Sequence, residues 1–238
     1  MKLHHPALSG HLIKRYKRFL ADVKLTDGRF ITAHTPNTGA MLGCAEPGSR
    51  IWLYNTHNAN RKYPYSWDLV EDTQGHLIGI HTGKANYLVR EAIENKTIRE
   101  LQGYEHIKPE VNLSHYNTRF DFLLSATHHK PDCFVEVKNV TAKHPPNTAI
   151  FPDAISARGK KHLEALSQAV QLGYRAVIFF CIQRNDIKQF MPATDIDPAY
   201  ADTLRTACDI GVEALAYKAK VTTKEITLYQ RVPIILKE

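Results

Sequence analysis

The pattern of apolar and polar positions changes near residue 84. Before it, short apolar runs such as "RFITAHT" (29–35), "RIWLYN" (50–55), "YSWDLVED" (65–72) and "HLIGIHT" (76–82) are separated by turn residues, including Asp27-Gly28. An Asp-Gly pair between two apolar runs is typical of a β-hairpin. We expect roughly five strands and no helix in this part, which predicts a small barrel. An OB-like and an SH3-like barrel both fit.

After residue 84, helical and extended patterns alternate. Residues 85–101 place Leu88, Ala92 and Leu101 on one helical stripe, and further amphipathic patterns cover 158–173 and 197–211. Strands are expected at 107–113, 118–126, 133–141, 175–184, 212–221 and 226–236. The order α-β-β-β-α-β followed by α-β-β predicts a mixed sheet between helices, an α/β domain. We therefore predict two domains, a barrel at 1–83 and an α/β domain at 84–238.

The composition indicates a soluble globular protein. Of 238 residues, 43% are hydrophobic and 23% are charged, which excludes a disordered chain. The start of the chain has no apolar segment typical of a signal peptide, and the longest wholly apolar run, 176–182, is shorter than a membrane span. We expect a cytoplasmic protein without a membrane partner. The four cysteines show no C-x-x-C spacing and are predicted to be buried apolar residues, and the thirteen histidines form no zinc motif.

The net charge of +7 favours a polyanionic partner, nucleic acid first. Residues 1–83 contain ten Lys and Arg against six Asp and Glu, whereas the longer remainder contains twenty-one against eighteen, so excess positive charge is denser in the barrel. Basic residues there alternate with aromatic ones, although at least half of those aromatic residues belong to the core. We expect a DNA-facing surface at Arg15, Lys17, Arg18, Arg61 and Lys62.

The stretch "FVEVKNVT" (134–141) reads as a buried strand that carries two charges. Glu136 and Lys138 are two residues apart and therefore point to the same face. Asp121, in the preceding predicted strand, can approach Glu136 if the two strands pair. Two close carboxylates favour a divalent cation such as Mg²⁺, and a lysine beside them could orient a water molecule. An internal ion pair of Lys138 with one of the acids explains the pattern equally well.

Two polar segments are placed to form the surroundings of that strand. In "FPDAISARGKKHL" (151–163), a helix start and the side chains of Arg158, Lys160 and Lys161 could receive a phosphate group. The alternative is an exposed basic first turn with no ligand. The "TPNTG" segment (35–39) is either a tight turn or a loop that packs against the cleft.

The chain resembles two families at these positions. The D-x(14)-E-V-K pattern on an α-β-β-β-α-β core is similar to the PD-(D/E)-x-K nuclease superfamily. More specifically, "RYKRFLADV", "AHTPNTGAMLGC", "RKYPYSWDLV", "EVKNVT", "FPDAISARGKKHL" and "RAVIFFCIQR" together resemble the sugar fermentation stimulation protein A family over nearly the whole chain. The resemblance implies an N-terminal OB-like domain and a C-terminal restriction-endonuclease-like domain. It also implies DNA binding without strong sequence preference, with a link to sugar (maltose) utilisation.

Carried over residue by residue, the nuclease pattern implies a catalytic set of Asp121, Glu136 and Lys138. Asp121 and Glu136 would hold Mg²⁺ or Mn²⁺. An extra acid from the first helix is common in the superfamily; Glu91 is the natural candidate and Glu110 its rival. The sequence departs from the family at "KHLEAL", where the helical glutamate stands at 164 instead of 165.

We predict a DNA-binding protein of low sequence specificity that contacts backbone phosphates, with a regulatory link to sugar utilisation genes. The first alternative is a Mg²⁺- or Mn²⁺-dependent nuclease acting on DNA or RNA. The second is a transcriptional co-regulator with an idle acidic site. No helix-turn-helix stands out, which argues against a reader of specific sequences. The oligomeric state, a homodimer included, is left open by the sequence.

Overall fold

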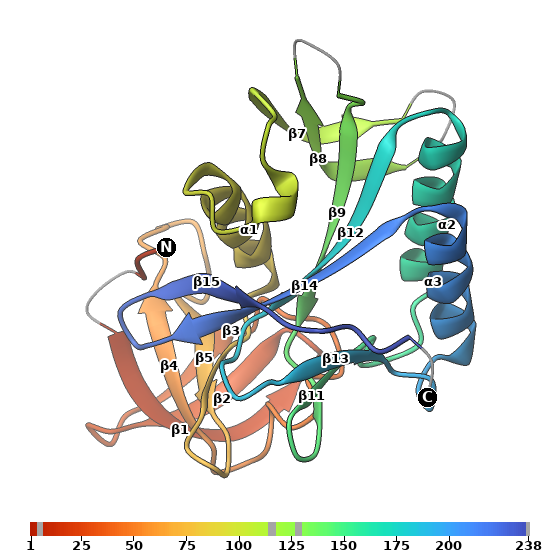
Figure 1. The fold of residues 1–238 in the computed structure, drawn as a ribbon. Helices are drawn as coiled ribbons and strands as arrows, with labels where there is room; N and C mark the ends of the chain where they lie inside the picture. Colours follow the sequence, from red (N-terminus) through yellow and green to blue (C-terminus); the bar gives the residue numbers. More distant parts are fainter. Residues whose placement is uncertain (4–6, 114–117, 127–129, 237–238) are drawn as a thin grey trace.

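The N-terminal part folds as a closed barrel (Figure 1). The computed structural model describes residues 1–3, 7–113, 118–126 and 130–236. The strands of the first sheet are β1 (Ala7–Tyr16), β2 (Leu20–Leu25), β3 (Phe30–His34), β4 (Arg50–Asn55), β5 (Tyr65–Glu71) and β6 (Leu77–Gly79). β1 pairs with both β2 and β4, and a parallel contact between β3 and β5 closes the barrel. This Greek-key order is that of an OB fold and decides against the SH3-like alternative.

Alternating side chains fill the barrel. Leu12, Val23, Leu53 and Trp67 come from four different strands and are all essentially inaccessible to solvent. A tight turn joins β1 to β2. Lys17 adopts φ 49° and Arg18 adopts φ 65°, so two consecutive left-handed residues reverse the chain.

The second domain is built on a six-stranded mixed sheet. Its helical elements are η1 (Thr82–Lys84), α1 (Ala85–Glu94), η2 (Arg99–Leu101), α2 (Ala157–Gln171) and α3 (Pro198–Ile210). Its strands are β7 (His106–Asn112), β8 (Arg119–Ser125), β9 (Cys133–Val140), β12 (Arg175–Ile182), β14 (Glu213–Val221) and β15 (Ile226–Arg231). They lie in the order β15-β14-β12-β9-β8-β7, with β9, β12 and β14 parallel. The predicted mixed sheet is confirmed.

Helices cover both faces of this sheet (Figure 1). Leu88 and Val89 of α1 pack against Val135 of β9 on one face, in a core that also includes Trp52 of the barrel. On the other face, Leu163 of α2 and Leu204 of α3 pack in a second core. Because both faces are covered, β12 is buried along nearly its whole length, as its apolar sequence predicts.

A small third sheet was not predicted from the sequence. It consists of β10 (Lys143–His144), β11 (Thr148–Phe151) and β13 (Gln189–Pro192), with β11 and β13 parallel. The segment 142–148 contains β10 and the start of β11, but its polar, Pro-rich composition is typical of a loop. The first helix is also shorter than expected: it ends at Glu94, and Lys96 then adopts φ 64°.

Polar contacts join the two domains. The buried Arg184, which follows β12, donates from Nη2 to Asp72 Oδ2 at 2.9 Å, and Asp72 follows β5. The amide of Gly79 donates to the carbonyl oxygen of Gln183 at 2.8 Å. The barrel and the mixed sheet therefore meet through specific hydrogen bonds as well as apolar packing.

The cysteines are reduced, and three of them are buried. Burial raises the thiol pKa of both Cys44 and Cys133 to about 12, so these groups are unreactive packing residues, as predicted. Within the described ranges, no helix is long and apolar enough to cross a membrane.

Candidate functional site

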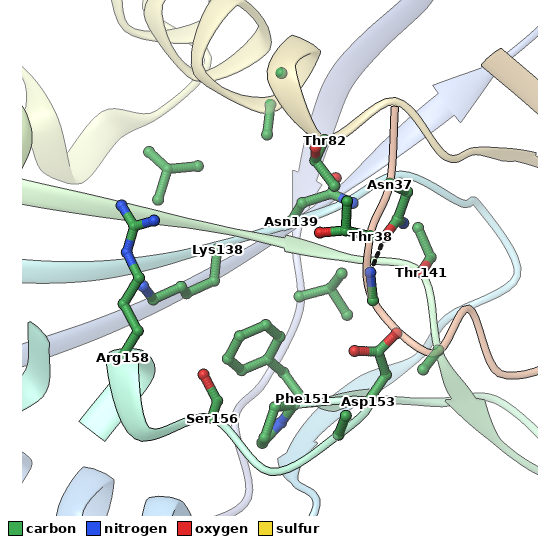
Figure 2. Close-up of a pocket in the computed structure, with 18 of the residues that line it drawn as sticks. Asn37, Thr38, Thr82, Lys138, Asn139, Thr141, Phe151, Asp153, Ser156 and Arg158 are labelled. Atoms are coloured by element: carbon green, nitrogen blue, oxygen red, sulfur yellow. Dashed lines mark hydrogen bonds between the residues drawn. The ribbon is translucent and has the colours of Figure 1, made fainter. Parts of the chain in front are cut away.

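A cleft of about 520 Å³ opens between the barrel and the mixed sheet. Figure 2 shows it with Lys138 and Arg158 on one side, and Asn37, Thr38 and Asp153 on the other. The strand β9 runs along the cleft, and the segment from β11 to the start of α2 forms its lower edge in this view. The cleft therefore joins parts of the chain that are more than a hundred residues apart.

Asp121 lies in this cleft at the point where β8 and β9 separate. Their pairing ends at Phe122 and Val135, and the Asp121 side chain takes over: its Oδ2 accepts a hydrogen bond from the Val137 amide at 2.7 Å. Its Oδ1 accepts one from the Asn86 side chain at 2.7 Å. Burial, together with the negative charge of Glu136, raises the pKa of Asp121. Asp121 is thus held by two hydrogen bonds in a largely buried place close to a second carboxylate.

Glu136 and Lys138 share one face of β9, as predicted. The Glu136 side chain is 5% exposed, and its Oε1 accepts a hydrogen bond from Lys138 Nζ at 2.7 Å and contacts His162 Nδ1. Burial opposes ionisation of this carboxyl, but the hydrogen bonds from His162 and Lys138 outweigh it and lower the pKa of Glu136. In the part of the chain that the structure describes, Glu136 Oε2 is buried and has no hydrogen-bond partner.

Helix α2 supplies His162, which is buried, and Arg158. The Nδ1 atom of His162 contacts Glu136 Oε1, and Arg158 Nε donates to His162 Nε2 at 3.3 Å. The helix is held in place by its N-cap, Ser156, whose Oγ accepts from the Gly159 amide at 3.0 Å. A chain of contacts therefore runs from Glu136 through His162 to the guanidinium of Arg158.

The barrel contributes the opposite wall through the loop 37–41. Arg15 Nη2 donates to the carbonyl oxygens of Asn37 and Gly39, each at 2.9 Å, and fixes the loop from beneath. On the other side, the Met41 amide donates to Asp153 Oδ2 at 2.8 Å. A Cβ on Gly39 would lie 2.7 Å from the same oxygen, so only glycine fits there without movement. Of the two interpretations of the segment 35–39, a tight turn or a loop that packs against the cleft, the structure favours the loop.

The structure brings together some of the predicted site residues and leaves others apart. Asp121, Glu136, Lys138, Arg18 and Arg158 line the cleft. Five of the predicted DNA-contacting residues are exposed but do not belong to the described lining of the cleft: Lys17, Arg61, Lys62, Lys160 and Lys161.

Three expectations are corrected by geometry. The structure does not bring Glu91 to the cleft: its carboxylate pairs with the amino group of Met1 at 2.5 Å, because residues 86 and 91 face different sides of α1. Glu110 lies 3.4 Å from Arg119 on exposed strands away from the cleft. Arg15 uses Nη2 to bond the backbone carbonyls of the loop and is not among the described residues that line the cleft.

Sequence reasoning missed Asn86 and Asp153 and gave His162 no role. Asn86 stands at a helix start, where asparagine usually reads as a capping residue, so no signal distinguished it. Asp153 and His162 lie within "FPDAISARGKKHL", where the basic residues drew attention to phosphate binding instead. The histidine pairs at 4–5 and 128–129 lie outside the described residues.

A second group of ligand-type residues lies at the domain contact. Asp72, His76 and Asp186 come close enough to hold an ion. Lys143 already donates to Asp186 Oδ2 at 2.7 Å, and Arg184 bonds both carboxylates. These acids are neutralised by the protein, unlike Asp121.

The fold and the cleft define a two-domain protein, an OB barrel joined to a restriction-endonuclease-like domain with an Asp–Glu–Lys set. Two family models match: the SfsA N-terminal OB domain at residues 13–80 and the sugar fermentation stimulation protein RE domain at residues 83–225. The chain belongs to the sugar fermentation stimulation protein family.

Its relatives match over their full length. A sugar fermentation stimulation protein homolog of Pseudoalteromonas atlantica is 49% identical over 236 residues, 99% of this chain and all of that one. A homolog from Geobacter sulfurreducens is 50% identical over 238 residues, all of both chains. The structure of Pyrococcus furiosus SfsA in complex with Ca²⁺ superposes with a TM-score of 0.87 at 27% identity, covering 99% of each chain. Family and fold together support a role in binding or cleaving DNA.

Proposed function

We propose that the chain binds DNA along its phosphate backbone and hydrolyses a phosphodiester bond in the cleft with the help of a divalent cation. The observation that carries this proposal is the convergence of Asp121, Glu136 and Lys138, from two adjacent strands, on one cleft that also presents Arg18 and Arg158. Acids without basic neighbours would repel a phosphate group, and basic residues without acids would bind one but offer no place for a metal.

The residues fit a divalent cation. Glu136 Oε2 is a buried carboxylate oxygen without a partner among the described residues, which is costly unless something binds it. Asp121 lies in the same cleft, and burial together with the negative charge of Glu136 raises its pKa, so a cation bound beside the two carboxylates would favour their charged forms. Mg²⁺ and Mn²⁺ accept one or two carboxylates together with water and phosphate oxygens. Such an ion, when bound, would polarise a phosphate oxygen and lower the pKa of a bound water molecule. The relative from Pyrococcus furiosus was solved with Ca²⁺.

In this proposal Lys138 orients the attacking water molecule or the phosphate group. Its ammonium group is held by Glu136 Oε1 at 2.7 Å and lies 3.3 Å from His162 Nδ1, so few orientations remain open to it. From there it can donate to a water molecule or to a phosphate oxygen as negative charge develops. Arg158, on the same wall, and Arg18, at the barrel side, are placed to bind phosphate groups on either side of the reacting one.

A second function, DNA binding without cleavage, is favoured by one contact. Lys138 and Glu136 form an ion pair, which neutralises one acid without any metal. Such a protein would bind backbone phosphates and leave the DNA intact. A role in regulating sugar (maltose) utilisation rests on the family name, since no cleft residue accounts for it.

Cleavage assays separate the two functions. Labelled single- and double-stranded DNA, and RNA of the same sequence, are incubated with Mg²⁺, Mn²⁺ or EDTA. We expect metal-dependent cleavage that is lost in Asp121→Asn/Glu136→Gln and in Lys138→Ala. Glu91→Gln, an acid outside the cleft, is the matched control and should cleave normally. Unchanged DNA binding by all variants, with no cleavage under any metal, would reject the nuclease and leave the binding protein.

A further inference from the structure

The most exposed large apolar side chain in the described structure stands at the cleft. Ile155 is 82% exposed, although it belongs to the segment that carries the phosphate-binding candidates. Exposing an isoleucine to this extent removes it from any packing role within the chain. Because Ile155 lies among the residues that line the cleft, its side chain is available to contact a molecule that enters there.

Phe151 continues this apolar surface inside the cleft. Its ring is half-buried and held against Tyr200, with ring centroids 5.3 Å apart, and against Phe180 at 6.0 Å. Figure 2 shows Phe151 between the Lys138 side and the Asp153 side. Apolar and aromatic side chains beside a line of cations are the arrangement that binds unpaired bases, because every base offers a flat face.

The dimensions of the cleft also restrict the substrate. Its volume of about 520 Å³ lies in the range of roughly 300–1,000 Å³ that holds a ligand of drug size, and therefore one or two nucleotides. The side chains of Glu136 and Lys138 are only 5% and 11% exposed, so a phosphate group must descend below the surface to reach them. A flexible single strand reaches such recessed groups more easily than a rigid duplex.

Hydrogen bonds on two sides hold the loop 37–41, which forms the barrel wall of the cleft. Arg15 fixes the carbonyls of Asn37 and Gly39 from one side, and Asp153 holds the Met41 amide from the other. Gly39 has no free space toward Asp153.

We propose that the cleft takes single-stranded DNA in preference to duplex, with a phosphate group at Lys138 and an unpaired base against Ile155 and Phe151. The inference rests on the proposed function for the identity of the ligand, DNA, and adds the strand form. In a duplex the bases are stacked and paired, so Ile155 and Phe151 would find no partner, and only the cations would contribute.

Binding measured apart from cleavage tests this. Fluorescence anisotropy compares one labelled 20-mer as a single strand and as a blunt duplex, at equal salt in EDTA. Wild type should bind the single strand roughly tenfold more tightly. Ile155→Ala should weaken single-strand binding about fivefold, at the lower end of base-stacking effects, and leave duplex binding unchanged. Leu172→Ala, which removes a side chain that is 57% exposed outside the cleft, is the control.

The outcomes separate this inference from the proposed function. Equal affinity for both strand forms, or an equal effect of Ile155→Ala on both, overturns the inference. Metal-dependent cleavage of duplex as fast as single strand overturns it too, while the nuclease function stands. A single-strand preference that depends on Ile155, without any cleavage, supports the inference and rejects catalysis. All binding measurements use the full-length chain. Thermal unfolding confirms that each variant is folded.

Discussion

Replacement of Arg184 by methionine tests the contact that holds the two domains together. The Arg184 side chain is only 3% exposed. Its Nε donates to Asp186 Oδ1 at 2.6 Å, its Nη2 donates to Asp72 Oδ2 at 2.9 Å, and its Nη1 donates to the Thr141 carbonyl at 3.0 Å. One side chain therefore bonds a carboxylate of the barrel, a carboxylate of the second domain and a backbone group beside β9.

The structure gives the scale of the loss. Removing one partner of a buried ion pair costs about 3–5 kcal/mol, because the remaining charge stays buried without compensation. The side chains of Asp72 and Asp186 are only 10% and 6% exposed, and Lys143 and the ring of His76 are the partners left to them among the described residues. We expect Arg184→Met to lower the free energy of unfolding by about 3 kcal/mol. Arg90→Met removes an ion pair whose arginine is 46% exposed and should cost at most about 0.5 kcal/mol.

Urea unfolding at several pH values measures both the cost and its cause. Burial of Asp186 opposes ionisation, but hydrogen bonds from Arg184 and Lys143 outweigh it and lower the pKa of this carboxyl to about 2. A pKa below the unfolded value means that the stabilisation is complete above about pH 5 and is lost as the pH falls toward 2, about 2 kcal/mol in all. In Arg184→Met this acid-dependent loss should shrink. A cost below about 1 kcal/mol, or an unchanged acid dependence, would refute the argument.

Two further predictions concern the cleft. Arg158→Ala should weaken DNA binding about equally for all sequences and reduce the slope of log affinity against log salt by roughly one, as expected for a single phosphate contact; an unchanged slope in a salt titration would place Arg158 off the DNA. Gly39→Ala adds a Cβ 2.7 Å from Asp153 Oδ2, so the loop must shift, at about 1–3 kcal/mol of unfolding free energy, with weaker DNA binding. Urea unfolding measures the loss of stability, and fluorescence anisotropy measures the loss of DNA affinity. A Gly39→Ala variant with wild-type stability and affinity would show that the loop 37–41 shifts without cost.

The sequence predicted the charged strand because the pattern is local. Period-two alternation put Glu136 and Lys138 on one face, and the short distance to the preceding strand put Asp121 beside them. The buried strands and the helix ends followed from equally local signals, such as Asp197 and Pro198 at the start of α3.

The failures at Glu91, at Arg15 and at the third sheet have a common cause, which is that they depend on where distant segments meet. Nothing in the neighbourhood of Glu91 reveals that its carboxylate meets Met1. Arg15 reads as an exposed cation in a basic stretch, and only the fold shows that its guanidinium holds the loop 37–41. The parallel pairing of β11 with β13 brings together segments about forty residues apart, so neither strand carries a sign of the other in its own sequence.

The position of β9 between β8 and β12 has a consequence for the order of events during folding. Asp121 and Glu136 can meet as soon as the antiparallel pair β8–β9 forms, since that pairing is short in range. His162, however, reaches Glu136 only when α2 has crossed over and β12 has paired in parallel with β9, a slow, non-local step. The two carboxylates therefore come together with Lys138, which lies on β9 itself, before His162 arrives. In that interval Lys138 offsets part of their repulsion, and a divalent cation present during folding would offset more of it and speed the assembly of the sheet around the two carboxylates.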